Sequence, residues 1–216
     1  MSSPLESRRQ LLHRAALGAG AVAATGLLRP PVANAQSADD EDLRDFLVEA
    51  VGLEQVTVLA YATAADAEGV SAPLRQTLEQ LRDQDQAHAN ALRSAIDSLG
   101  FDAPDAPDSA EDTVVFDDVD GLSEEAAEIL TGSLEELEGL SERDQLLEFV
   151  SGLESDQLEL YLGRGPDLDS EDLSTTCAEI AGCQAQHLVA LGIALGDDPA
   201  EALSAADAAV LAPAGE

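Results

Sequence analysis

A carboxylate and a phenol recur at matching positions in the two halves of the chain. Gly52-Leu53-Glu54 is repeated as Gly152-Leu153-Glu154, and Tyr61 is repeated as Tyr161, both at an offset of 100 residues. These two tyrosines are the only ones in the sequence. Such rare residues would not be expected to coincide in register by chance, so the repeat predicts a site to which both halves contribute.

A histidine recurs in the same way, three residues after a polar side chain. Asp85-Gln86-Ala87-His88 aligns with Gln184-Ala185-Gln186-His187 at an offset of 99. The third histidine of the chain, His13, lies in the N-terminal segment. Carboxylate and imidazole are ligands that divalent transition metals accept. On a helix, side chains three residues apart project from one face, so one helix can direct two ligands at one point.

Four long helices are predicted to position these groups. Apolar residues recur in steps of three and four, which is the spacing of one helical face. The predicted helices cover residues 40–69, 73–99, 142–163 and 170–196. Short links join the first to the second and the third to the fourth, and a long link joins the two pairs. The sequence therefore predicts an all-α four-helix bundle made of two helical hairpins and one long crossover.

The crossover, residues 100–141, is an acidic connector that is rich in proline and aspartate as far as residue 121. An accessory helix is predicted within it over residues 123–140. One side of that helix is expected to carry its apolar residues, Ile129, Leu130, Leu134 and Leu137. A further short helix is expected from residue 199 to about residue 211.

Six polar side chains lie on the apolar stripes of the four helices. They are Glu54, Asp85, His88, Glu154, Gln184 and His187. A buried carboxylate costs several kcal/mol unless it is paired, hydrogen-bonded or bound to a metal. Three carboxylates that meet only two histidines oppose one another's ionisation, and a divalent cation removes that conflict. The stripes therefore predict a metal site, with both tyrosines packed nearby and hydrogen-bonded to it.

This pattern resembles the ferritin-like di-iron carboxylate proteins, and it is similar to their exported bacterial members. The resemblance extends from about residue 40 to residue 196. It implies that one or two iron or manganese ions are bound. Glu54 and Glu154 would be the terminal or chelating carboxylates, and His88 and His187 would each bind one metal. Asp85 would be a shortened bridging acid.

Two positions depart from the family pattern. Asp85 replaces a glutamate, which shortens the side chain by one methylene, and Gln184 replaces the second glutamate, which removes a charge and a bidentate bridge. A single-metal site, a weak mixed site and a metal-free hydrogen-bonded core are all compatible with these changes. The first function hypothesis is iron or manganese binding or oxidation. The alternative is a non-enzymatic bundle, structural or stress-related, that has lost its metal chemistry.

The first 35 residues have the features of an export signal. Ser7-Arg8-Arg9-Gln10-Leu11-Leu12 resembles the twin-arginine signature, and an apolar run over residues 15–28 follows it. Ala33-Asn34-Ala35 fits a small-x-small cleavage site, which would leave residues 36–216 as the mature chain. The interpretation predicts a location in the periplasm, in the cell envelope or outside the cell. An uncleaved N-terminal membrane anchor is the alternative.

The charge balance restricts the partners. The chain contains 44 acidic residues against 10 basic ones, all arginine, for a net charge of −34. Such a charge repels nucleic acids and anionic membrane surfaces. Metal ions are therefore the expected partners. A homodimer is also compatible with the sequence. Cys177 and Cys183 are expected to be small, buried or flanking thiols, and a ligand or redox role is the alternative. Six residues span about 9 Å along a helix, which is beyond disulfide reach.

Overall fold

The computed structural model describes residues 38–116 and 119–203. Within that part of the chain the main elements are helices, and the only β-type pairing is an isolated bridge between Glu68 and Glu142. The predicted all-α fold is confirmed. The predicted export signal and the end of the predicted last helix lie outside the described residues, although residues 199–203 are helical.

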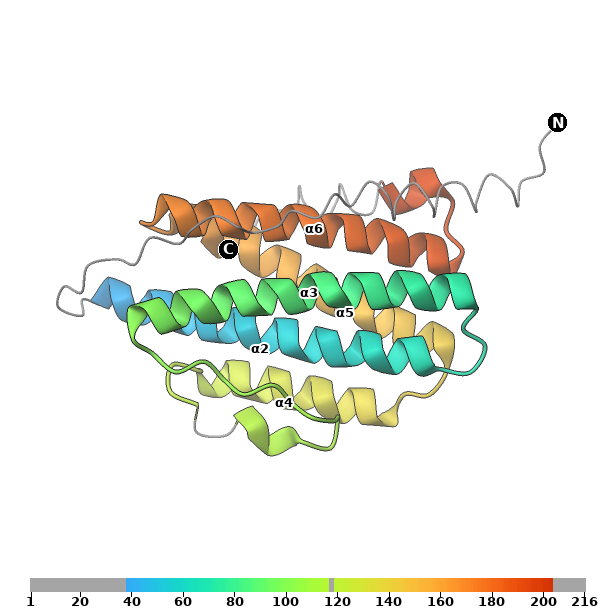
Figure 1. Ribbon diagram of the computed structural model, residues 1–216, viewed down its shortest axis with the longest axis horizontal. Coiled ribbons are helices and arrows are strands. Elements are labelled where there is room, and N and C mark those ends of the chain that lie inside the picture. Colours follow the sequence, from blue (N-terminus) through green and yellow to red (C-terminus); the bar gives the residue numbers. More distant parts are fainter. Residues whose placement is uncertain (1–37, 117–118, 204–216) are drawn as a thin grey trace.

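Two helical hairpins form the bundle (Figure 1). The first consists of α2 (Ala38–Asp66) and α3 (Ala72–Leu99), and the second of α5 (Arg143–Arg164) and α6 (Glu171–Leu195). α2 also packs against α5, so one helix from each hairpin forms the centre of the molecule. The long crossover carries a short 3-10 helix, η1 (Thr113–Phe116), and then α4 (Glu124–Gly139), which lies along α2 (Figure 1). A second 3-10 helix, η2 (Gly165–Asp167), follows α5.

The turn of the first hairpin follows from its local sequence. α2 ends at Asp66, before the expected residue 69, and Gly69 turns the chain with a φ of +85°. Such a left-handed conformation costs glycine little. Ser71 then caps α3 by accepting a hydrogen bond from the Leu74 backbone N–H, and the proline that follows suits the first helical turn. At the other end of α3, Gly100 closes the helix with a φ of +81°.

α2 is enclosed on several sides, because α4 covers the face that α3 and α5 leave open. Its apolar character is sufficient for a membrane span, and so is that of α6, but in this fold the apolar surface of α2 forms the core. At Gly52 a Cβ atom would lie 2.5 Å from Leu130 Cδ1, so the helices approach closely there. α4 buries Leu130, Leu134 and Leu137, as predicted.

The prediction for Ile129 is wrong, because its side chain is 51% exposed. Successive helical residues point about 100° apart, so the face that buries Leu130 turns Ile129 towards solvent.

Two apolar clusters fill the bundle, and a polar layer separates them. One cluster contains Leu78 of α3 and Leu147 of α5, and the other contains Leu92 of α3 and Leu158 of α5. On each of the four helices, the candidate site residues lie in sequence between members of the two clusters. The layer is therefore walled by apolar side chains at both ends, which isolates its charges from bulk water.

Candidate metal centre

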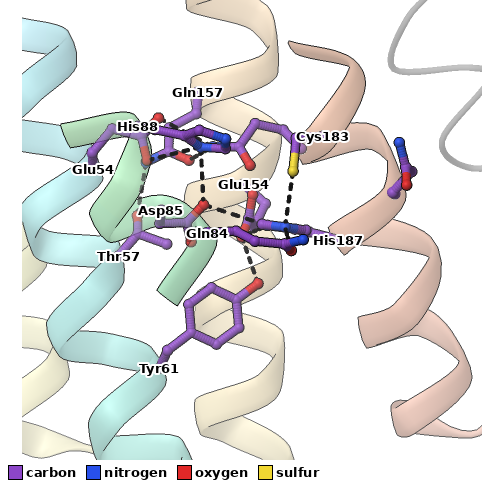
Figure 2. A network of polar contacts seen from close by, with 12 residues as sticks. Glu54, Thr57, Tyr61, Gln84, Asp85, His88, Glu154, Gln157, Cys183 and His187 are labelled. Carbon is purple, nitrogen blue, oxygen red and sulfur yellow. Dashed lines mark hydrogen bonds and ion pairs between the residues drawn. The ribbon is translucent and has the colours of Figure 1, made fainter. Parts of the chain in front are cut away.

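The structure brings the six candidate residues together in this polar layer. Figure 2 labels five of them, all except Gln184. Five of them are fully buried, with exposed fractions of 0–1%: Glu54, Asp85, Glu154, Gln184 and His187. His88 retains 15% exposure of its side chain. The layer is polar because each helix places one or two polar side chains on its inward face. The role of these residues as metal ligands stays a prediction.

Each tyrosine hydrogen-bonds to the glutamate of the opposite hairpin. Tyr61 donates to Glu154 Oε1 at 2.5 Å, and Tyr161 donates to Glu54 Oε1 at 2.7 Å. Seven residues span about 10 Å along a helix, so each tyrosine lies two turns from the glutamate of its own helix. Because α2 and α5 run antiparallel, the earlier residue on one helix meets the later residue on the other. The prediction that the tyrosines bond to the polar cluster is confirmed.

Gln184 occupies one side of the layer as a hydrogen-bond donor. Its Nε2 donates to Glu54 Oε1 at 3.3 Å and to Gln157 Oε1. Gln157 in turn donates to Thr57 Oγ1 at 3.0 Å. The substitution that distinguishes the second half of the repeat therefore places amide hydrogens, rather than a carboxylate, beside Glu54.

The two histidines direct Nδ1 towards the carboxylates. His187 Nδ1 lies 2.9 Å from Glu154 Oε1 and 3.4 Å from Asp85 Oδ1. His88 Nδ1 lies 3.4 Å from the same Asp85 oxygen and 3.6 Å from Glu54 Oε2. The imidazole rings are nearly parallel, with centroids 6.4 Å apart. Asp85 thus lies between the two histidines (Figure 2).

Two groups of ligand atoms are close enough to surround a metal ion, and they share Asp85. One consists of Asp85, Glu154 and His187, and the other of Glu54, Asp85 and His88, with the ligand atoms of each group within 4.8 Å of one another. Several of the same side chains carry buried atoms without a hydrogen bond: both Asp85 oxygens, one oxygen of each glutamate and His88 Nδ1. Buried oxygens without a hydrogen bond are costly, and a cation would satisfy them.

This donor set fits the metal that the resemblance implies. Carboxylate oxygens and imidazole nitrogens suit iron and manganese among the divalent first-row ions. Asp85 is placed to contribute to both groups, which is the position expected of a bridging carboxylate. Each glutamate keeps Oε2 for a metal while a tyrosine fixes Oε1, so each carboxylate is held in orientation without losing its free oxygen.

Burial and the neighbouring charges shift the pKa values of several groups in the layer. Burial and the charge of Glu154 raise the pKa of Asp85 well above its usual value. Burial lowers the pKa of His88, but the charge of Glu54 and the close approach of Asp85, Cys183 and Glu54 outweigh it and raise that pKa to about 12. The pKa of His187 is raised in the same way, mainly by Glu154 and Asp85.

Several residues of the layer were missed from the sequence. Gln84 and Cys183 approach His187 Nε2, and Thr57 and Gln157 extend the network across the bundle. Two spacings in the sequence could have identified some of them. Thr57 and Gln157 are separated by the offset of the repeat, and Cys183 precedes His187 by one helical turn. Both cysteines are free, as predicted.

The thiol of Cys183 differs from that of Cys177. Burial disfavours the thiolate of Cys183, but hydrogen bonds and charge from His187 and His88 prevail and lower its pKa to about 6. Burial alone raises the pKa of Cys177 to about 11.

Comparison with known proteins supports the resemblance. The model of the ferritin-like domain family matches residues 42–197, which include both hairpins, the crossover and all six candidate ligands. No curated protein and no solved structure matches the chain. The match covers well over half of the sequence, and the chain belongs to the ferritin-like domain family.

Proposed function

We propose that this protein binds a divalent iron or manganese ion in the polar layer. The observation that carries the proposal is the convergence of Glu54, Asp85 and Glu154, each fully buried and each with an oxygen that has no hydrogen bond. Burying such oxygens without a hydrogen bond is unfavourable, and apolar clusters separate them from water at both ends. A bound iron or manganese ion would supply one-electron redox chemistry at this position.

We infer that the two ligand groups differ in affinity. The group formed by Asp85, Glu154 and His187 is fully buried and contains the shortest imidazole–carboxylate contact, at 2.9 Å. In the other group, the amide hydrogens of Gln184 point at Glu54, and His88 makes only longer contacts. An amide N–H carries partial positive charge and disfavours a cation beside it. The first ion therefore binds at Asp85, Glu154 and His187, and a second ion binds weakly.

The negative charge of the chain and its proposed location favour the binding of cations. A net charge of −34 gives the chain a negative field, which raises the local concentration of cations at its surface. The proposed location, outside the cytoplasm after export, rests on the twin-arginine-type segment of the sequence. Together these features favour a protein that captures or oxidises iron or manganese in the cell envelope or beyond it.

The alternative is a metal-free structural bundle, and Gln184 is the observation that favours it. Its amide links Glu54 to Gln157, and through Gln157 to Thr57, without any cation. Protons on Asp85 and on both histidines would balance the two glutamates. In that case the layer would specify the packing of the helices rather than bind metal.

Metal content distinguishes the two functions. The protein would be purified from medium supplemented with iron and manganese, and metal per chain would be measured by elemental analysis. The wild type is expected to retain at least one ion, and a His88→Ala/His187→Ala variant is expected to lose it while keeping its helical circular dichroism. A Glu135→Ala/Glu136→Ala variant, which removes two exposed carboxylates of α4, controls for surface binding. Equal, near-zero metal in all three proteins would favour the structural bundle.

A further inference from the structure

Cys183 lies on the outer edge of the His187 ring, away from the carboxylates. It is half-buried, on the turn of α6 before His187, and its Sγ is 3.3 Å from His187 Nε2. Gln84 Oε1 approaches the same nitrogen at 2.8 Å. The ring therefore has two sides: Nδ1 faces Glu154 and Asp85, whereas Nε2 faces the thiol and the Gln84 amide (Figure 2).

The outer side of the ring is also the side nearest to solvent. Glu54 on α2 and Glu154 on α5 are fully buried. The partly exposed residues around the histidines are Gln84, His88 and Cys183, and all three belong to α3 or α6. Cys183 therefore lies between the proposed ion and the bulk solvent, where water could compete for the Nε2 proton.

The Asp85 oxygens identify the metal-facing side of the His187 ring without any reference to Cys183. Asp85 is 0% exposed, neither of its oxygens has a hydrogen bond, and one of them lies 3.4 Å from His187 Nδ1. An ion that satisfies these oxygens requires an unprotonated Nδ1, because only that tautomer has a lone pair on this side. With its carbonyl oxygen towards the ring, Gln84 can only accept a hydrogen bond, which favours the tautomer with the proton on Nε2.

We propose that Cys183 is a positioning residue for the metal site, acting with Gln84 as an acceptor for the Nε2 proton of His187. The two acceptors fix the ring orientation and the tautomer that presents the Nδ1 lone pair to Asp85 and Glu154. Acceptors of this kind, bound to the far nitrogen of a metal-binding histidine, commonly contribute a factor of about 10–100 to metal affinity. The inference rests on the proposed metal binding.

The test compares the two cysteines of α6 in the full chain. Co(II) affinity would be measured by competition titration in the wild type, Cys183→Ala, Cys183→Ser and the control Cys177→Ala, whose thiol lies in the apolar core. We expect Cys183→Ala to weaken Co(II) binding about tenfold or more. Cys183→Ser should recover most of the loss, since a hydroxyl also accepts a hydrogen bond, and Cys177→Ala should leave affinity unchanged. Unaltered affinity in Cys183→Ala, or an equal loss in Cys177→Ala, would overturn the proposal.

Two spectroscopic readouts separate this role from its competitors. Near-ultraviolet absorption of the Co(II) protein reports a sulfur–cobalt bond. A charge-transfer band present in the wild type and absent in Cys183→Ser would make the thiol a direct ligand and contradict a positioning role.

Imidazole signals in ¹H–¹⁵N spectra of the metal-free protein test the hydrogen bond without any metal. The His187 Nε2–H signal should persist in the wild type and in Cys177→Ala and broaden in a Cys183→Ala/Gln84→Leu variant; a signal that is equally sharp in all three would refute the proposal. Absence of Co(II) binding by the wild type would refute the proposed function instead.

Discussion

Replacing Gln184 by glutamate restores the carboxylate that the second half of the repeat lacks. Gln184 Nε2 lies 3.3 Å from Glu54 Oε1, so in Gln184→Glu a carboxylate oxygen would take the place of that donor. The favourable amide–carboxylate contact becomes a repulsion between two buried anions. A cation placed between them turns the repulsion into attraction to both. The substitution should therefore destabilise the metal-free protein and strengthen metal binding.

The size of the effect follows from the geometry. Two unit charges 3.3 Å apart repel by about 5 kcal/mol at an effective dielectric constant of about 20. Keeping a glutamate protonated at pH 7 instead costs about 1.4 kcal/mol for each pH unit above its usual pKa of about 4.3, or roughly 4 kcal/mol. Protonation is the cheaper route, so the metal-free variant should lose up to about 4 kcal/mol of stability. Metal binding should recover most of that loss.

Urea unfolding of the wild type and of Gln184→Glu, with chelator and with excess Mn(II), measures this difference. The matched control is Gln186→Glu, which adds the same charge at an exposed position two residues away on α6. We expect Mn(II) to stabilise Gln184→Glu more than the wild type, and metal per chain to rise. If Gln184→Glu is as stable as Gln186→Glu in chelator and binds no additional metal, Gln184 does not occupy a ligand position and the assignment is refuted.

Three further outcomes are expected. Metal binding must displace protons from one carboxyl and two imidazoles whose pKa values are raised, so metal affinity should fall as pH falls. In competition titrations, log K plotted against pH should have a slope of up to about three. An affinity that does not change with pH would contradict this expectation. Gly52→Ala places a Cβ atom against Leu130, whereas Gly152→Ala places one in open space. In urea unfolding, the first variant should therefore be less stable than the second by about 1–3 kcal/mol. Equal stabilities would refute the close contact. Tyr61→Phe removes the hydrogen bond to Glu154 and should cost about 1.5–3 kcal/mol in thermal unfolding, against no change if that contact is absent.

The fold was predictable because the apolar periodicity of each helix and the lengths of the links are evident in short stretches of the sequence. The four helix stripes bury most of the residues that their spacing indicates, and the link lengths define the hairpins. The repeat also indicated which polar side chains would meet, since Glu54 and Glu154 occupy equivalent inward positions. Ile129 was misjudged because the apolar spacing does not show that α4 buries only the face that carries Leu130.

The details of the site depend on contacts between helices, which a single stripe cannot show. Tyr61 bonds to Glu154 rather than to the glutamate of its own helix, because α2 and α5 cross antiparallel at the polar layer. Gln84 and Cys183 are partly exposed, so their positions on α3 and α6 looked like ordinary surface. Their contact with His187 exists only when the two hairpins are assembled.

The position of a bound ion would show whether the polar layer is a metal site. Crystals of the Mn(II)-loaded protein would be measured at a wavelength where manganese scatters anomalously. We expect an anomalous peak in the polar layer, in contact with His187 Nδ1, Asp85 and Glu154, with any second peak beside Glu54 and His88 weaker. An empty layer with hydrogen bonds unchanged, or peaks only at acidic side chains on the surface, would contradict it.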